Sequence, residues 1–303
     1  MDLITTEELC KEYAGKMVIN HVNMHIPEQS IYGFVGENGS GKTTIMRLLT
    51  GLAEPTSGSF TLFGVSNKDR EIYKVREQVS AIVEATSLIP SMTARDNMIY
   101  QELYLGIKQS EEERQALLKK VHLEDVGIKK VRNFSLGMKQ RLGIALALMS
   151  KPKLMLLDEP MNGLDPEGIA ELRDLLIEMN QKEGITVLIS SHILSELEKI
   201  ASCYGFISHG KLLEEITAEE LQDKCRKSVN VKVDDIEKAV PILNIMNIKD
   251  FKAYPNGDIK IFDNVKINDL IVSLSSGGVN VIGINSADES VEDYYLSLIK
   301  EGK

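Results

Sequence analysis

No stretch of this chain approaches the roughly 20 consecutive apolar residues that a helix needs to cross a bilayer. Residues 1–10 are acidic rather than basic, so they lack the cationic region of a secretory signal. Only three cysteines occur, and Cys10, Cys203 and Cys225 are too far apart for a metal cluster. We expect reduced thiols in a cytosolic protein, and we expect any passage across a membrane to be supplied by another chain.

Positive charge is also scarce. Lys and Arg number 35 against 45 Asp and Glu, which gives a formal net charge of -10 and a pI of about 5.2. This balance argues against general nucleic-acid binding, which needs a basic face, but it does not exclude a local basic patch. With 43% hydrophobic and 26% charged residues, the 303-residue chain has a globular composition and fits one large domain plus a small one.

The segment 1–220 alternates between apolar strands and helices, which is the pattern of an α/β domain. The strand predicted at 154–157 is apolar throughout, as expected of a parallel strand buried on both faces. The other predicted strands are residues 18–26, 30–35 and 185–190, and the predicted helices are residues 43–50, 94–131 and 169–179.

The composition shifts near residues 217–227, a charged segment predicted to be helical, and residues 221–303 are predicted to form a small α+β accessory domain. Within it, Asn256-Gly257 after a proline is a strong hairpin signal. The predicted order is strand 229–233, helix 236–245, strand 252–253, strand 259–262, helix 267–276, strand 279–284 and helix 291–299.

A glycine-rich loop is the strongest chemical signal. The run Gly36-Glu37-Asn38-Gly39-Ser40-Gly41-Lys42-Thr43 matches G-x-x-x-x-G-K-[ST]. Crowded phosphate oxygens are best held by backbone N–H groups, and glycines let the main chain curl closely enough to aim several of them inward. The following helix adds its positive N-terminal end. We expect Lys42 to reach the β- and γ-phosphates and the Thr43 hydroxyl to bind Mg²⁺.

A second motif is the apolar strand that ends in Asp158 and Glu159. Ligands bind at the carboxyl ends of parallel strands, so Asp158 is expected to hold Mg²⁺ directly or through water. Glu159 is the candidate general base that orients and polarises the attacking water. The two motifs together define a P-loop nucleotidase, a class that includes kinases, GTPases and helicases.

Three further segments narrow that class. Ser135 and Gly137 begin an apolar helix, and a serine and a glycine at a helix start can form a second anion site. The segment Asn162–Asp165 follows the carboxylates, and His192 follows the next strand. Each feature alone is compatible with an ordinary cap, loop or structural histidine. In this order, His192 is expected to sense the γ-phosphate.

In these motifs, and over about residues 2–220, the sequence resembles the ATPase subunits of ABC transporters. The resemblance implies a RecA-like core, an antiparallel β subdomain and a helical subdomain at about residues 86–150. It implies that Tyr13 stacks on adenine beside Val18, and that Ser135 and Gly137 contact ATP bound to a partner subunit. The implied catalytic residues are Glu159, His192 and Lys42. The implied nucleotide-binding residues are Tyr13, Val18, Gly36, Glu37, Asn38, Gly39, Ser40, Gly41, Lys42, Thr43, Thr44, Ser135 and Gly137.

Two departures from the family pattern matter. Leu136 and Met138 stand where the usual signature has glycine and glutamine, a form similar to resistance exporters whose permease is a separate chain. Glu84 stands at the position of the Q-loop glutamine, which resembles lantibiotic self-immunity and bacitracin-resistance transporters; a neutral replacement is the alternative. A carboxylate there would bind a metal more strongly than an amide but would repel phosphate. Glu84 therefore joins Thr43 and Asp158 as an expected metal ligand.

The sequence thus predicts an ATP-hydrolysing homodimeric motor on the cytoplasmic face of a bacterial membrane, with a separate permease and without nucleic acid. Export or expulsion of a lantibiotic or bacitracin-like peptide is the leading function, and a multidrug exporter is the nearest alternative. A soluble ABC-type switch acting on ribosomes or DNA is the alternative from another class, but such proteins carry two cassettes or long coiled coils. The Asp158-Glu159 pair and the signature disfavour a nucleotide kinase. The tail Ser290–Tyr295 resembles the same exporter group and is expected to support packing or dimerisation.

Overall fold

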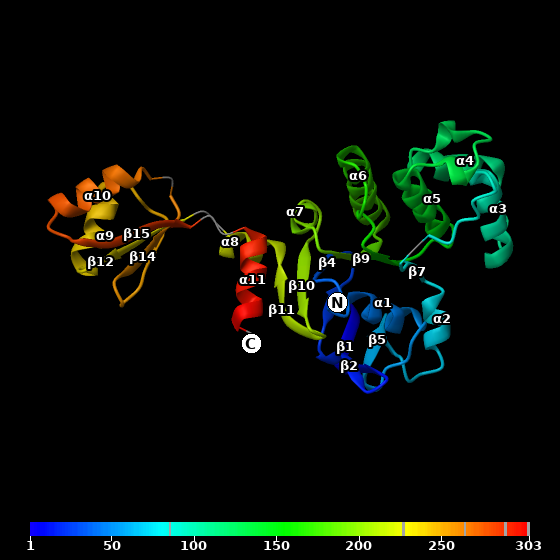
Figure 1. The fold of residues 1–303 in the computed structure, drawn as a ribbon, viewed down its shortest axis with the longest axis horizontal. Coiled ribbons are helices and arrows are strands. Elements are labelled where there is room, and N and C mark those ends of the chain that lie inside the picture. The colour runs from blue at the N-terminus through cyan, green and yellow to red at the C-terminus, as the bar shows by residue number, and fades with distance from the viewer. Residues whose placement is uncertain (85, 226–227, 264, 288–289, 302–303) are drawn as a thin grey trace. The chain divides into compact units, whose positions relative to one another are not determined.

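The computed structural model describes residues 1–84, 86–225, 228–263, 265–287 and 290–301 (Figure 1). They separate into two compact units, Met1–Ala218 and Glu219–Lys300, and each is described by itself. The end of the charged segment predicted to be helical, residues 226–227, lies outside the described residues.

A six-stranded sheet is the centre of the first unit, in the order β11-β10-β4-β9-β8-β7. Neighbouring strands are parallel except β10 and β11, which are antiparallel. The middle strands are almost continuously buried because other elements cover both faces. The strands are β4 (Ile31–Val35), β7 (Val79–Ile82), β8 (Leu154–Asp158), β9 (Thr186–Ser191), β10 (Cys203–Ser208) and β11 (Lys211–Thr217).

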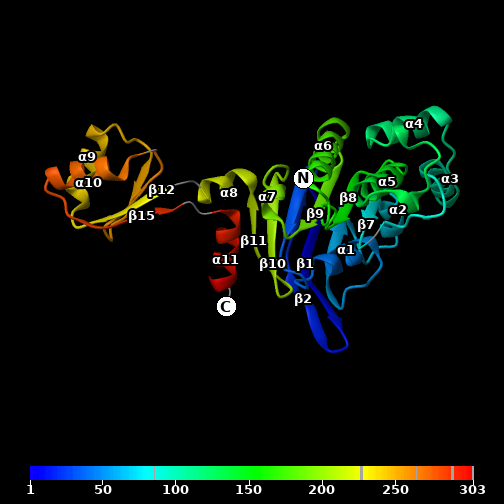
Figure 2. The same ribbon diagram turned by 45° about the horizontal axis from the view of Figure 1, so that its top comes forward.

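A second sheet of five strands covers helix α1, which packs between the two sheets (Figures 1 and 2). One apolar cluster joins Ile45 and Leu48 of α1 to Phe60 of the second sheet and Leu156 of the first. Figure 1 shows α6 on the opposite face of the six-stranded sheet. These elements are β1 (Asp2–Tyr13), β2 (Lys16–Val22), β3 (His25–Pro27), α1 (Lys42–Thr50), β5 (Ser57–Leu62), β6 (Val65–Ser66), α2 (Ile72–Arg76), α6 (Pro166–Glu183) and α7 (Leu194–Leu197).

A helical subdomain lies between β7 and β8 in the chain. Reciprocal capping boxes at Thr93 and Ser110 begin its first two helices. The helical stretch predicted for residues 94–131 is interrupted, because Gly106 adopts a left-handed conformation and ends the first helix. The elements are α3 (Ala94–Leu105), α4 (Glu111–Lys120), 3-10 turns at Glu124–Val126 and Val131–Asn133, and α5 (Leu136–Leu148).

The second unit is built on a four-stranded antiparallel sheet in the order β13-β14-β12-β15. This order, with one helix inside each half, is the ferredoxin-like arrangement. Val231, Leu243, Ile259 and Leu270 belong to its separate apolar core. The elements are α8 (Ala218–Lys224), β12 (Ser228–Val233), α9 (Ile236–Ile245), β13 (Phe251–Ala253), β14 (Asp258–Ile261), α10 (Ile267–Ser276), β15 (Val281–Ala287) and α11 (Val291–Glu301).

One predicted strand in this unit is displaced. The strand expected at residues 279–284 begins at Val281, because the Val279 N–H donates to the carbonyl oxygen of Leu274 and so belongs to the turn after α10. Across the residues that the structure describes, no helix has the length and apolar character required to span a membrane.

Candidate functional site

Three loops meet where β4, β8 and β9 end. The strands are parallel neighbours, so their carboxyl ends lie at one edge of the sheet. The glycine-rich loop follows β4, Asp158 ends β8, and His192 follows β9. The register sets Asp158 opposite Ser190 on the neighbouring strand. Residues far apart in the chain are thereby brought to one place.

The glycine-rich loop requires glycine at two points for different reasons. A Cβ atom at Gly36 would lie 2.5 Å from the carbonyl oxygen of Ile207, so the chain passes too close for a side chain. Gly41 precedes α1 with a φ of 115°, which side chains rarely tolerate. The loop therefore curls tightly over the start of α1, where unpaired N–H groups and the positive helix end favour an anion.

Lys42 is buried beneath this loop, with 5% of its side chain exposed. Its Nζ donates to the carbonyl oxygens of Gly36 at 2.6 Å and Glu37 at 3.1 Å, and lies 3.5 Å from Glu159 Oε1. A buried ammonium needs such partners. Two buried oxygens here, Ser40 Oγ and Glu159 Oε1, have no hydrogen-bond partner within the described residues. The site thus holds polar groups that a bound ligand could satisfy.

Two hydroxyl groups donate hydrogen bonds to the Asp158 carboxylate. Its Oδ2 accepts a hydrogen bond from Thr43 Oγ1, and its Oδ1 accepts one from Ser190 Oγ, both at 2.6 Å. Ser190 Oγ also accepts from the Glu159 N–H at 2.9 Å. Hydroxyl and carboxylate oxygens suit Mg²⁺, which usually takes one or two carboxylates together with substrate phosphates. The Thr43–Asp158 pair therefore fits this ion, although the described residues contain no larger His, Cys, Asp or Glu cluster able to hold a metal.

Glu159 links this centre to His192. Its Oε2 lies 2.7 Å from His192 Nδ1. The Glu159 backbone has a φ of 50°, a left-handed conformation that is uncommon for a residue other than glycine. Such conformations concentrate at functional sites. The three residues predicted as catalytic, Lys42, Glu159 and His192, therefore form one continuous set of contacts.

A cavity of about 160 Å³ opens beside these residues. It is lined by Val18, Asn38, Gly39, Gly41, Lys42, Thr43, Thr44, Asp158 and Glu159. Tyr13, predicted to stack on adenine, does not line it. Tyr13 is 41% exposed at the end of β1, and Lys11 Nζ lies 4.7 Å from the centroid of its ring. Ser135 and Gly137 also lie outside this cavity of their own chain.

The predicted signature lies at the start of α5. Ser135 caps the helix, its Oγ accepting from the Met138 N–H at 3.2 Å. The unusual Leu136 contacts the loop that follows the carboxylates, since a Cβ atom at Gly163 would lie 3.0 Å from Leu136 Cδ2. An ion pair between Arg141 and Glu171 joins α5 to α6 farther along. The signature and the Asn162–Asp165 segment therefore form one connected surface.

Glu84 is not brought to the Thr43–Asp158 pair. It follows β7 by two residues, does not line the cavity, and is ion-paired with Arg47 on α1. The Glu84 side chain is 61% exposed, and its backbone is left-handed with a φ of 69°. The expectation that Glu84 binds the metal therefore remains a prediction.

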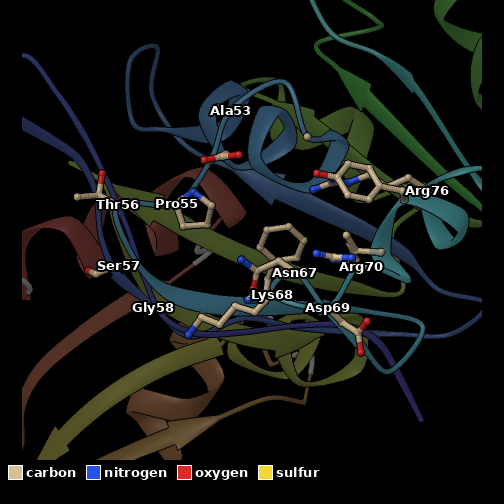
Figure 3. Close-up of a pocket in the computed structure, with 15 residues that line it drawn as sticks. Ala53, Pro55, Thr56, Ser57, Gly58, Asn67, Lys68, Asp69, Arg70 and Arg76 are labelled. Carbon is tan, nitrogen blue, oxygen red and sulfur yellow. Dashed lines mark hydrogen bonds between the residues drawn. The ribbon is translucent and has the colours of Figure 1, made fainter.

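A larger hollow of about 550 Å³ lies elsewhere, between the loop after α1 and the segment from β6 to α2. Figure 3 shows the side chains of Lys68, Asp69, Arg70 and Arg76 around it. Arg76 donates to the carbonyl oxygens of Leu48 and Leu49 in the last turn of α1, and burial lowers the pKa of its guanidinium. None of the residues predicted for the site lines this hollow.

The parallel core, the inserted helical subdomain and the phosphate loop beside an acidic strand end define an ATP-binding cassette. Residues 19–162 match the family model described as ABC transporter. The chain is 39% identical to the bacitracin transport ATP-binding protein BcrA of Bacillus licheniformis, over 99% of this chain and 98% of BcrA. It is 46% identical to the lantibiotic transport ATP-binding protein SrtF of Streptococcus pyogenes, over 70% of this chain and 90% of SrtF. The chain therefore belongs to the ABC transporter ATP-binding family, and it is an ATP-binding protein with ATPase activity.

Solved structures agree with this assignment. The cassette cbiO1 of Clostridium perfringens superposes with a TM-score of 0.66 and 27% identity, over 74% of this chain and 91% of that one. A dimeric ATP-binding cassette bound to ADP and Pi superposes with a TM-score of 0.63 and 26% identity, over 71% and 98%. The expected RecA-like core with antiparallel and helical subdomains is confirmed.

Three contacts at or near the site were not predicted. Ser190 bridges Asp158 and Glu159, and its signal was a hydroxyl at the end of an apolar strand. Arg47 is ion-paired with Glu84, and no local pattern in the sequence indicates this partner. The packing of Thr86 against α5 had no sequence signal, because it joins segments of unrelated pattern.

Proposed function

We propose that this chain is the ATP-hydrolysing motor of a bacterial transporter that exports an antimicrobial peptide, or expels it from the membrane, through a separate permease. The observation that carries the proposal is the continuous contact set Lys42–Glu159–His192 at the edge of the phosphate-loop cavity. A triphosphate that ended beside this set would meet a buried cation, a carboxylate and an imidazole.

In this proposal the loop N–H groups and Lys42 hold the phosphates, and the Thr43 hydroxyl and Asp158 hold Mg²⁺ with Glu84. The metal, when bound, neutralises charge on the phosphate oxygens. Glu159 accepts a hydrogen bond from the attacking water and aligns it with the γ-phosphorus. His192, hydrogen-bonded to Glu159, orients that carboxylate and faces the γ-phosphate. The overall reaction is ATP + H₂O → ADP + Pi.

The nucleotide is proposed to be shared between two copies of the chain. Ser135 and Gly137 lie outside the cavity of their own chain, on a surface connected to the Asn162–Asp165 segment. A second copy facing the first would supply them to the phosphates, with the start of α5 as the anion site. Tyr13 and Val18 would then lie at the adenine end. ATP binding closes this homodimer, and hydrolysis reopens it.

The permease is proposed to contact the helical subdomain. Helix α3 presents Tyr100, Leu103 and Tyr104 on one side, with exposed fractions of 55%, 77% and 80%. Exposed apolar patches mark interaction sites. If this chain binds the permease through these side chains, it works at the cytoplasmic face of the membrane.

The cargo follows from the relatives. One acts in bacitracin transport and one in lantibiotic transport, by their names. A multidrug exporter remains the second candidate, because the permease selects the cargo. A ribosome- or DNA-acting switch is disfavoured by the acidic balance of the chain.

Glu159→Gln tests the proposal. The amide keeps the shape of Glu159 but cannot accept the proton of the attacking water. We expect ATP binding to persist, an ATP-dependent dimer to accumulate in size-exclusion chromatography, and steady-state hydrolysis to fall by about 100-fold or more. Rapid hydrolysis by this variant would refute the role of Glu159. Co-purification of the wild-type chain with a polytopic membrane protein tests the permease.

A further inference from the structure

Arg47 and Glu84 form an ion pair. The mechanism above gives Glu84 a role as a metal ligand but gives no role to Arg47. Arg47 lies on α1, and Glu84 lies in the loop after β7. Both side chains are partly exposed, at 39% and 61%. Exposed ion pairs are weak, so this pair can exchange its partner readily.

Two independent features set the backbone positions of the pair next to those of Thr43 and Asp158, although the Glu84 side chain itself lies outside the cavity. Arg47 is four residues after Thr43 on α1, so the two lie on the same face, about 6 Å apart along the helix axis. Strand β7 is the parallel neighbour of β8, with Ile82 opposite Leu157. Glu84 therefore leaves the sheet beside the end of β8, where Asp158 lies.

We propose that Arg47 is a positioning residue that competes with the divalent cation for the Glu84 carboxylate. Arg47, one helical turn after Thr43 on α1, holds that carboxylate, and the carboxylate moves from Arg47 to Mg²⁺ when the ion arrives with ATP. This inference rests on the proposed function, in which Glu84 is a metal ligand. According to this inference, Arg47 raises the Mg²⁺ concentration at which the site is half-saturated.

The loop that carries Glu84 connects its exchange between Arg47 and the metal to helix α5. Thr86, two residues further on, packs against α5 at Gly143, where a Cβ atom would lie only 2.2 Å from Thr86 Cγ2. Helix α5 begins at the signature. A movement of Glu84 between Arg47 and the metal would therefore press on the helix that presents Ser135 and Gly137. The state of one site would thus influence the surface offered to the other chain.

The experiment measures binding of the non-hydrolysable analogue AMP-PNP to the purified full-length chain by calorimetry, during a Mg²⁺ titration. We expect Arg47→Met to lower the half-saturating Mg²⁺ concentration by about 2- to 5-fold, the range set by weak exposed ion pairs. We expect Glu84→Gln to raise it. The double variant Arg47→Met/Glu84→Gln is expected to match Glu84→Gln alone, because Arg47 acts only through Glu84.

A matched control separates this effect from general charge. Arg95, another half-exposed arginine, pairs with Glu111 in the helical subdomain, and Arg95→Met should leave the Mg²⁺ requirement unchanged. The inference is overturned if Arg47→Met does not lower the requirement, or lowers it equally in the Glu84→Gln background. Failure of the parent chain to bind AMP-PNP, with or without Mg²⁺, would instead overturn the proposed function together with this inference.

Discussion

At the scale of single residues, Asp158 and Glu159 are adjacent carboxylates kept in different surroundings by one hydroxyl. Ser190 Oγ donates to Asp158 and accepts from the Glu159 N–H. The side chain of Asp158 is thereby held toward Thr43, while that of Glu159 contacts His192. The left-handed backbone of Glu159 needs such support, because an uncommon conformation persists only where its surroundings hold it.

Ser190→Ala should therefore impair hydrolysis more than binding. Removing the buried hydroxyl leaves the Glu159 N–H without its partner, at a cost of about 1–3 kcal/mol in unfolding free energy. We expect kcat to fall by at least about tenfold as Glu159 loses its orientation, with a small change in the affinity for ATP. Ser191→Ala is the matched control, since Ser191 is also buried and accepts from a backbone N–H, that of Ile193. An equal loss of kcat in both variants would contradict this role of Ser190.

The phosphate loop and the two carboxylates could be predicted because their chemistry demands particular residues at fixed spacing. The partner of Glu84 could not. Arg47 and Glu84 are brought together only when β7 takes its place beside β8, and no local pattern specifies that neighbour. The stacking on adenine that is predicted for Tyr13 also depends on more than local sequence, because it requires a bound nucleotide as well as the folded chain.

At the scale of elements, β5 is an example of a strand that the sequence pattern did not indicate. Strand β5 (Ser57–Leu62) is only partly buried and pairs with β1, with Ile4 opposite Leu62. Its sequence, SGSFTL, begins with two serines around a glycine and shows no clear alternation of apolar and polar residues. Strands β4, β8 and β9 were predicted because each is a continuous apolar run, whereas β7 and β10 of the same sheet were not predicted. The helices at residues 43–50 and 169–179 were also predicted.

Helix α5 provides an element-scale prediction. Gly143 lies in its interior, where glycine costs about 1 kcal/mol relative to alanine. The reason for glycine is the contact with Thr86, a β-branched residue with little rotamer freedom. We expect Gly143→Ala to lower the free energy of unfolding by about 1–3 kcal/mol through overpacking. Urea denaturation measures this.

The double variant Gly143→Ala/Thr86→Ser should recover most of that loss, because serine lacks the methyl group that the new Cβ would meet. A Gly143→Ala variant that is more stable than the parent would show that the loop yields freely, and that α5 does not respond to its position.

At the scale of the whole molecule, each of the two units has its own apolar core. The sequence predicted two domains from a change of composition near residues 217–227. In the proposed function, no single chain contains a complete site. The cavity is lined by the phosphate loop and the carboxylates, whereas Ser135 and Gly137 lie elsewhere on the surface. Two chains are needed if the proposed function is correct, and this requirement can be tested by mixing two inactive variants.

Lys42→Ala removes the ammonium that is proposed to bind phosphate but leaves the signature intact. Gly137→Asp places a negative charge in the signature but leaves the cavity intact, and a Cβ atom there meets nothing closer than 3.7 Å, so the fold should persist. Each variant alone should be inactive. An equal mixture should regain about a quarter of the wild-type ATPase activity, because half of randomly paired dimers are mixed and each mixed dimer has one intact site. A mixture as inactive as its components, while size-exclusion chromatography shows that mixed dimers form, would mean that a site is not completed by the signature of the partner.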